Sequence, residues 1–305
     1  MLALPSNSPV VRLSKHAFAY QQLPGSWCQN NVGIIQLDQA GAVLLVDTVA
    51  IEARNLMLRR ALETLAAVQI DVVNTHFHGD HTFGNFIFSD GNILGTELTA
   101  ELIVLAGDDL VRRQPGINFG NVQVTPPTKL VSNGYSISTA WGDVQFLEFK
   151  DAHTASDLVV WLPTERVLFT GDIAWNNVTP FALMGSVTGS IEALEILQRL
   201  DAQTVVPGHG PVGGAEMLQD CLDYLRLILV YAEQGINTGA NVWETAEEFE
   251  RESTNVKIDN ERNIANIARA FADLRGADDF DVLAELAVME KWKNRTSLHR
   301  GLGTV

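Results

Sequence analysis

The stretch that decides the fold is DVVNTHFHGDH, residues 71–81. It begins as a short apolar run typical of a buried strand and ends with three histidines and an aspartate close together. His76 and His78 are two residues apart, so they point to the same side of an extended segment. The turn that follows brings Asp80 and His81 back toward them. Because imidazole and carboxylate groups packed in this way suit a borderline-soft cation such as Zn²⁺, the stretch predicts a metal site.

Three more donor side chains are expected just after other strand-like segments. His153 comes after VQFLEFK, Asp172 after RVLFT and His209 after TVVP. Side chains at strand ends are held by a rigid scaffold, and functional sites are commonly built there. We expect two metal ions here, and each keeps a coordination position open for a shared hydroxide, as in catalytic sites. The seven donors form two sets and a bridge: His76, His78 and His153 for one ion, Asp80, His81 and His209 for the other, and Asp172 between them.

The composition excludes several classes of partner. The chain has 305 residues, with 21 Lys and Arg against 37 Asp and Glu, which gives a net charge of −16. Such acidity argues against nucleic acid or an anionic membrane surface, because both attract a basic face. No apolar run is long enough to span a membrane, and the N-terminus lacks the pattern of a signal peptide. Cys28 and Cys221 suggest no disulfide framework, so we expect a cytoplasmic protein.

The order of predicted elements indicates an α/β fold. Strands and turns precede a helix expected over 51–68, and a second set of strands begins near Lys129. Another helix is expected near 191–200, and the C-terminal third is almost wholly helical. This order predicts a four-layer αββα sandwich with a helical C-terminal extension. We place a catalytic domain at 1–235 and expect the extension, 236–305, to pack on the same domain.

The string HFHGDH at 76–81 resembles the H-x-H-x-D-H signature of the metallo-β-lactamase-fold hydrolases. His153, Asp172 and His209 follow in the order of that family. The match is highly specific, and the resemblance covers roughly residues 10–235. It implies the αββα sandwich, with a dinuclear metal site at the edge where the two sheets meet.

The resemblance also bears on the metal and on the branch of the family. Residue 78 is His where the diiron flavoprotein branch usually has Glu, so two zinc ions are expected, with iron or manganese as alternatives. A bridging aspartate such as Asp172 is typical of lactonases, thioesterases and nucleases and is usually absent from true β-lactamases. The basic residues that bind glutathione thioesters in glyoxalase II have no convincing match. The segments WCQNNVG (27–33) and PFALMGSVTGS (180–190) resemble a branch that includes thioesterase/cyclases of aromatic polyketide assembly.

These resemblances imply a dinuclear zinc-dependent hydrolase in which a metal-bridging hydroxide attacks an ester or thioester carbonyl, with a polyketide thioesterase/cyclase as one form. A lactonase or a glyoxalase II-like hydrolase is the alternative, while a β-lactamase, a nuclease or a non-catalytic metal-stabilised binding module fits less well. Asp80 is the predicted catalytic residue, because it can orient the hydroxide. No histidine near the motif is left over as a general acid, which suits a thiolate or lactone alkoxide leaving group better than an amine.

Large apolar side chains follow Asp172 within a long loop: Trp175, Phe181, Leu183 and Met184. They either wall a pocket for a large acyl substrate or pack in the core. Cys28 fits a small buried hydrophobe better than a catalytic thiol. We expect a small-molecule acyl, thioester or lactone substrate, and C-terminal helices that cap the pocket or form a homodimer face. Hydrolysis and cyclisation would use the same metal ligands, so both stay open.

Overall fold

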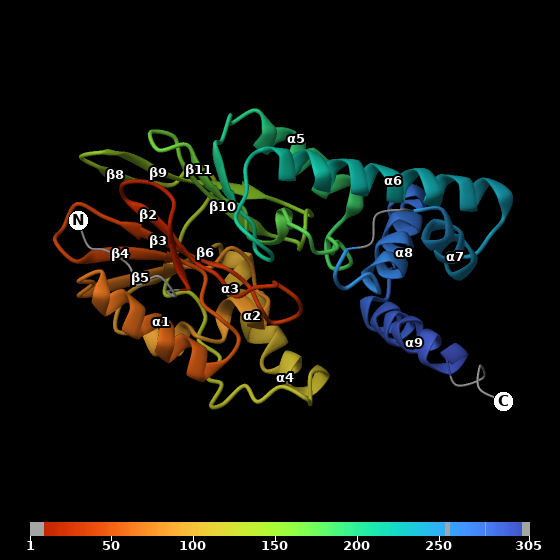
Figure 1. Cartoon of the computed structure of the whole chain (residues 1–305), viewed down its shortest axis with the longest axis horizontal. Helices are drawn as coiled ribbons and strands as arrows, with labels where there is room; N and C mark the ends of the chain where they lie inside the picture. Colours follow the sequence, from red (N-terminus) through yellow and green to blue (C-terminus); the bar gives the residue numbers. More distant parts are fainter. Residues whose placement is uncertain (1–8, 254–256, 278, 301–305) are drawn as a thin grey trace.

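The computed structural model describes residues 9–253, 257–277 and 279–300, and two β-sheets packed face to face form its centre (Figure 1). The first sheet has seven strands: β1 (Val10–Arg12), β2 (Ala17–Tyr20), β3 (Val32–Gln36), β4 (Ala42–Val46), β5 (Gln69–Val73), β6 (Ile93–Gly95) and β7 (Lys129–Leu130). They lie side by side in sequence order. The first four are antiparallel neighbours, and β4 to β7 run parallel.

The second sheet has five strands: β8 (Ser136–Thr139), β9 (Gly142–Phe149), β10 (Asp157–Leu162), β11 (Val167–Phe169) and β12 (Thr204–Val206). Their spatial order is β12-β11-β10-β9-β8. All neighbours are antiparallel except β11 and β12, which run parallel because helix α5 (Val187–Gln198) lies between them in the chain.

Helices cover the outer faces of both sheets, which gives four layers (Figure 1). Helix α1 (Glu52–Thr64) packs on the first sheet, and α5 and α6 (Glu216–Thr238) pack on the second. Shorter helices lie in the connections: α2 (Gly79–Thr82), η1 (Asn85–Phe88), α3 (Glu97–Ala106), α4 (Asp109–Arg113) and η2 (Gly171–Ile173).

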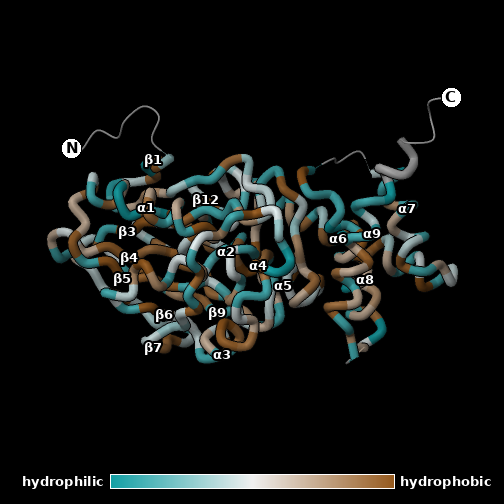
Figure 2. Tube along the Cα trace, turned by 90° about the horizontal axis from the view of Figure 1, so that it is seen from below, coloured by the Kyte–Doolittle hydropathy of each residue, from teal (hydrophilic) through white to brown (hydrophobic). Residues whose placement is uncertain are grey.

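Strand β10 shows why its sequence suits the middle of a sandwich. Leu158, Val160 and Leu162 face the first sheet, whereas Val159 and Trp161 face the helices on the other side. Successive side chains of a strand point to opposite faces, so a strand covered on both faces needs apolar residues at every position. The same hydrophobic character is visible along β4 in Figure 2.

Three more helices extend the molecule beyond one end of the sandwich: α7 (Val242–Glu252), α8 (Arg262–Arg275) and α9 (Val282–Arg300) (blue in Figure 1). Helix α8 shares a buried core with α5 and α6 through residues such as Ile264, Ile267 and Phe271. The domain boundary expected after residue 235 lies inside the last turn of α6. The extension is therefore joined to the sandwich by a continuous helix and a common core.

The structure has the predicted αββα sandwich with C-terminal helices, and two details differ from the sequence expectation. The strand at Lys129 is an edge strand of the first sheet, because it pairs with β6 and not with β8. The helix expected at 191–200 begins at Val187, because the Ser186 hydroxyl accepts a hydrogen bond from Gly189 N and caps it. None of the helices in the described part of the chain has the length and apolarity that crossing a bilayer requires.

Candidate metal centre

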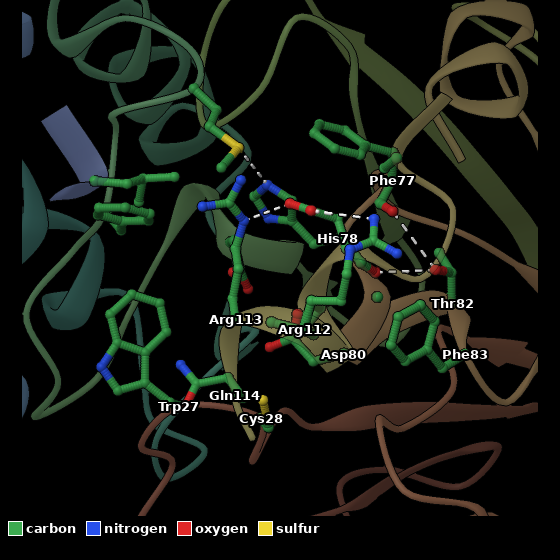
Figure 3. Close-up of a pocket in the computed structure, with 18 of the residues that line it drawn as sticks. Trp27, Cys28, Phe77, His78, Asp80, Thr82, Phe83, Arg112, Arg113 and Gln114 are labelled. Carbon is green, nitrogen blue, oxygen red and sulfur yellow. Dashed lines mark hydrogen bonds and ion pairs between the residues drawn. The ribbon is translucent and has the colours of Figure 1, made fainter. Parts of the chain in front are cut away.

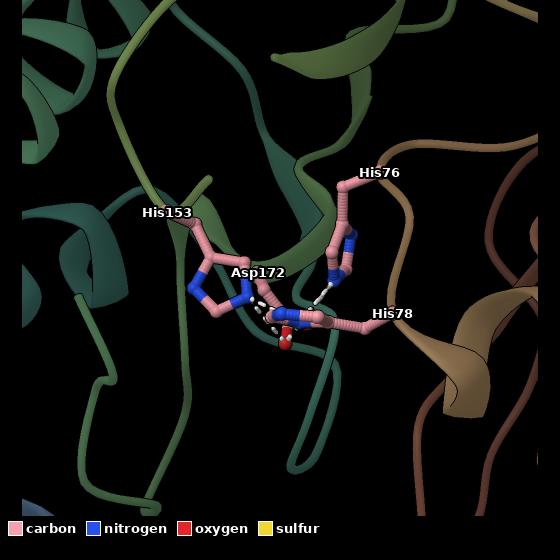
Figure 4. Close-up of side chains that lie close together, drawn as sticks. All are labelled: His76, His78, His153 and Asp172. Atoms are coloured by element: carbon pink, nitrogen blue, oxygen red, sulfur yellow. Dashed lines mark hydrogen bonds and ion pairs between the residues drawn. The ribbon is translucent and has the colours of Figure 1, made fainter. Parts of the chain in front are cut away.

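Seven side chains meet at one edge of the sandwich in two groups, and the candidate ligand atoms of each group lie within 4.8 Å of one another. One group contains His76, His78, His153 and Asp172, which converge in Figure 4. The other group contains Asp80, His81 and His209. The folding of the chain thus brings together all seven donors that the sequence singles out.

The two sheets contribute almost equally to these groups. Four donors lie between the end of β5, in the first sheet, and the end of α2. The other three follow β9, β11 and β12 of the second sheet. A site at the common edge of the two sheets results, because each of these strands ends at that edge.

Hydrogen bonds from the first sheet fix the rings of His76 and His81. The Nδ1 atom of His81 lies 2.9 Å from Asp47 Oδ2. Thr75 donates its hydroxyl to the same oxygen at 2.7 Å, and this leaves its oxygen to accept from His76 Nδ1 at 2.9 Å. Because Nδ1 of each ring is held by these contacts, the Nε2 atoms of His76 and His81 face the centre, where each can offer a lone pair to a metal ion.

Backbone carbonyls fix the other two rings in the same way. His153 Nδ1 donates to Phe181 O at 2.5 Å, and His209 Nδ1 donates to Gly25 O at 3.1 Å. The His209 ring also stacks on the indole of Trp175, with 4.7 Å between centroids and 10° between the planes. Four histidines therefore present Nε2 to the centre through contacts with residues that are not themselves ligands.

His78 is turned the other way and presents Nδ1. This atom lies 3.0 Å from Nε2 of both His76 and His153. Burial, together with the neighbouring His153, lowers the pKa of His78 to about 3, and burial also lowers the pKa of His76 and of His153. Three neutral rings thus direct lone pairs at one point, an arrangement that a cation stabilises.

Asp172 lies between the two groups. Its Oδ2 is 3.4 Å from His153 Nε2 and 3.6 Å from His209 Nε2, and its Oδ1 is 3.2 Å from His81 Nε2. Among the described residues, Oδ1 is buried without a hydrogen bond. Glycine is required at position 208, because a Cβ there would come within 1.8 Å of this oxygen. Asp172 has the position of a bridging ligand.

The carboxylates give the site a negative potential. Burial opposes the charged form of His81, yet the charges of Asp172, Asp47 and Asp80 raise its pKa well above the usual range. Burial opposes ionisation of Asp80, yet His81 and His209 lower its pKa. The carboxylates thus favour positive charge at the centre, and a metal ion would supply that charge.

The donor set fits two divalent ions of borderline softness. It offers five imidazoles and two carboxylates, and one carboxylate oxygen, Asp172 Oδ1, accepts no hydrogen bond among the described residues. Imidazole with carboxylate suits zinc, and three donors per ion with a shared aspartate leave positions for water and substrate.

The centre opens into a cavity of about 580 Å³ between the sandwich and the helical extension (Figure 3). Ile103 of α3 and Leu110 of α4 line one wall, and Leu286 and Met289 of α9 belong to its lining as well. Five of the seven donors also line it: His78, Asp80, His153, Asp172 and His209. The C-terminal helices therefore border the cavity, in line with the expectation that they cap the pocket. The other expectation, a homodimer face, stays a prediction.

Three of the four predicted pocket residues, Trp175, Phe181 and Met184, line this cavity. Leu183 is fully buried in the core instead. Cys28 also lines the cavity and is only 3% exposed, and burial raises the pKa of its thiol, with the charge of Asp80 adding to the effect.

Several residues at the site were not expected from sequence. Asp47, which holds His81, comes directly after β4, so the strand-end rule that selects the other donors could have found it. Arg262 of α8 and Leu286 and Met289 of α9 reach the cavity from the extension. No sequence pattern marks them, because their position depends on how the helices fold back.

A fold of two facing sheets with a His/Asp donor set at their edge defines a class of metal-dependent hydrolases. Residues 25–209 match the family model of the metallo-beta-lactamase superfamily, and the chain belongs to this superfamily.

Its relatives carry different activities in their names. The chain is 25% identical over 177 residues to a hydroxyacylglutathione hydrolase from Rhodospirillum rubrum, a match covering 58% of this chain and 60% of that protein. It is 23% identical over 225 residues to a metallo-beta-lactamase type 2 from Bacteroides fragilis, a match covering 69% of this chain and 82% of that protein. A metallo-beta-lactamase structure from Pontibacter korlensis has a TM-score of 0.58 at 20% identity, covering 71% of this chain and 98% of that one. The structural likeness establishes the fold alone.

Proposed function

We propose that this protein is a dinuclear zinc hydrolase that cleaves an ester or thioester with a large apolar acyl group. One observation carries the proposal: five of the seven donors line a cavity whose walls include many large apolar side chains. Two zinc ions, when bound, would supply Lewis-acid activation of a water molecule and of the substrate carbonyl.

Asp80 is the residue that acts on the attacking water. Its Oδ2 lies 3.3 Å from His209 Nε2, and its side chain is 14% exposed, against 3% for Asp172. Asp80 can therefore accept a hydrogen bond from a water in the cavity while Asp172 is enclosed. The low pKa of Asp80 keeps it ionised and able to accept.

The leaving group is a thiolate or an alkoxide. Among the described residues that line the cavity, every histidine belongs to the donor set, so none is free to protonate an amine as it departs. A thiolate leaves without a proton, and this favours a thioester over an amide.

The acyl end of the substrate is uncharged. In the described part of the chain, the four cations that line the cavity outside the metal centre are paired: Arg112 and Arg113 contact Asp109, Lys293 contacts Glu261 at 2.8 Å, and Arg262 contacts Asp259 at 3.3 Å. The walls contributed by Ile103, Leu286 and Met289 are apolar. The WCQNN segment also contributes Trp27 and Cys28 to the lining, and this supports the polyketide thioesterase/cyclase form of the proposal.

A glyoxalase II-like activity is the second candidate. It is favoured by the 25% identity to a hydroxyacylglutathione hydrolase. Arg112, Arg113 and Lys293 would have to exchange their acidic partners for the carboxylates of a glutathione group.

A substrate panel tests the proposal. Zinc-loaded protein is assayed on thioesters with short and long acyl chains, a glutathione thioester, a lactone and a β-lactam. We expect the long-chain thioester to be cleaved fastest and a chelator to abolish turnover, with recovery on adding zinc. Comparable rates on the β-lactam and the thioesters would overturn the proposal, and so would turnover that survives removal of the metal.

A further inference from the structure

We propose that Arg262 and Asn266 of helix α8 are positioning residues for the metal centre, so that the C-terminal extension is part of the catalytic apparatus. The two residues hold the non-ligand groups that orient His209 and His153. The inference concerns metal binding, and it stands whatever the substrate is.

The guanidinium of Arg262 is enclosed between two indole rings. Its Cζ atom lies 4.0 Å from the centroid of Trp27 and 4.5 Å from that of Trp175, and the residue is 1% exposed. Stacking on two aromatic faces requires the planar guanidinium, which a lysine ammonium does not reproduce. Arg262 also donates to Thr179 O at 2.9 Å and lies 3.3 Å from Asp259 Oδ2.

The Trp175 ring contacts both Arg262 and His209, which is one of the predicted metal ligands. One face of the indole meets Arg262, and the indole lies nearly parallel to His209 at 4.7 Å. Trp175 is itself fixed, because its Nε1 donates to Asp172 O at 2.6 Å. Arg262, Trp175 and His209 thus form a stack that ends at the metal centre.

Trp27 connects Arg262 to the other side of the same ligand. Its Nε1 donates to Glu261 Oε1 at 3.0 Å, so the loop that carries Trp27 is tied to the start of α8. Gly25 in this loop accepts the hydrogen bond from His209 Nδ1. The residues at the start of α8 therefore hold both neighbours of the His209 ring.

Asn266, one turn further along α8, fixes the segment that orients His153. Its Nδ2 donates to Pro180 O at 2.7 Å, and its Oδ1 accepts from Ala182 N at 2.9 Å. Phe181, between these two residues, supplies the carbonyl that accepts from His153 Nδ1. The buried side-chain amide of Asn266 thus fixes the position of the Phe181 carbonyl, which orients His153.

Burial of a guanidinium costs desolvation free energy, and proteins in which apolar side chains replace buried charged groups are often no less stable than the originals. Packing alone therefore does not account for Arg262 at this position. A planar, charged group that contacts two rings, a carbonyl and a carboxylate at once fixes two loops, those of Trp27 and of Trp175 and Thr179, against the start of α8.

The test compares Arg262→Met and Asn266→Ala with the wild-type chain in full length. Zinc affinity is measured by competition with a chromophoric chelator, and the cobalt-substituted proteins are examined by visible absorption. We expect each variant to bind zinc about 10- to 100-fold more weakly, to show altered cobalt bands, and to lose kcat with little change in KM. Arg275→Met is the matched control, because Arg275 is an exposed arginine of the same helix whose Cζ lies 5.1 Å from the Phe271 ring.

A purely structural role predicts a different result. It would lower the melting temperature of the metal-free protein and leave zinc affinity and the cobalt spectrum at their wild-type values. That outcome in folded Arg262→Met and Asn266→Ala overturns the inference. If Arg262→Met does not fold, Asn266→Ala decides, because it removes the hydrogen bonds of this side chain to Pro180, Ala182 and Tyr224 and no charge.

Discussion

Asp47 Oδ2 accepts hydrogen bonds from both His81 Nδ1, at 2.9 Å, and the Thr75 hydroxyl, at 2.7 Å. Its other oxygen, Oδ1, accepts from Thr75 N at 2.7 Å. The carboxylate is 2% exposed, and burial raises its pKa although the contact with His81 opposes the shift. One buried side chain thus aligns His81 directly and His76 through Thr75.

Asp47→Asn is expected to weaken zinc binding. The amide has one acceptor oxygen, so its NH₂ group would face either Thr75 N–H or the two donors that share Oδ2. Partners of this kind affect metal affinity or activity about 10- to 100-fold, and we expect a loss in that range by chelator competition. Asp71→Asn is the control, because Asp71 contacts Asn92 in an exposed position. Unchanged zinc affinity in Asp47→Asn would show that Asp47 does not position the ligands.

Asp80→Ala is expected to reduce turnover far more than stability. The substitution removes a predicted ligand and the proposed acceptor for the attacking water, and it leaves the buried core intact. We expect kcat to fall by at least about 100-fold and the metal-free melting temperature to stay close to that of the wild type. Elemental analysis should find fewer than two zinc ions per chain. Wild-type turnover in this variant would contradict the assigned role.

Met289→Trp is expected to change acyl-chain selectivity. Met289 of α9 lines the cavity, and a larger side chain there takes space from the acyl group. We expect kcat/KM for a long-chain thioester to fall more than that for an acetyl thioester. Lys291→Met is the control, because Lys291 is exposed on the same helix and does not line the cavity. Equal losses on both substrates would place the acyl group elsewhere.

Cys28 is expected to resist alkylation although it lines the cavity. Burial and the neighbouring charge of Asp80 raise the pKa of its thiol, and the thiolate is the reactive form. The raised pKa keeps the thiol protonated through neutral and mildly alkaline pH. Iodoacetamide should label the folded protein slowly and label both Cys28 and Cys221 after denaturation, as mass spectrometry would show. Rapid labelling of Cys28 in the folded protein would indicate an activated thiol.

The donor set was predictable because each member belongs to a local pattern. His76 and its neighbours share one short motif, and His153, Asp172 and His209 each come just after an apolar strand. Since β9 and β11 are both antiparallel to β10, and β12 is parallel to β11, these three strands end at the same edge of the sheet and their end residues meet there.

Other features depend on tertiary packing and had no local signal. Arg262 occupies a helix start where a charged residue is ordinarily solvated, and only the folding of α8 onto the loops places it between Trp27 and Trp175. Leu183 and Met184 are neighbours in one apolar loop, yet the first is buried in the core and the second reaches the cavity. Composition does not distinguish two such side chains, because their direction is set by the backbone of the loop.

The division of the donors between the two sheets has a consequence for the strength of the whole chain. Four donors follow a strand of the first sheet and three follow strands of the second, and among the described residues the strands pair with one another only within each sheet. Ions held by donors from both sheets would link the two sheets across their interface, and this link could be removed with the metal. The free energy of binding the ions would then also oppose separation of the sheets, so the concentration of metal in solution would affect the stability of the sandwich as well as its chemistry.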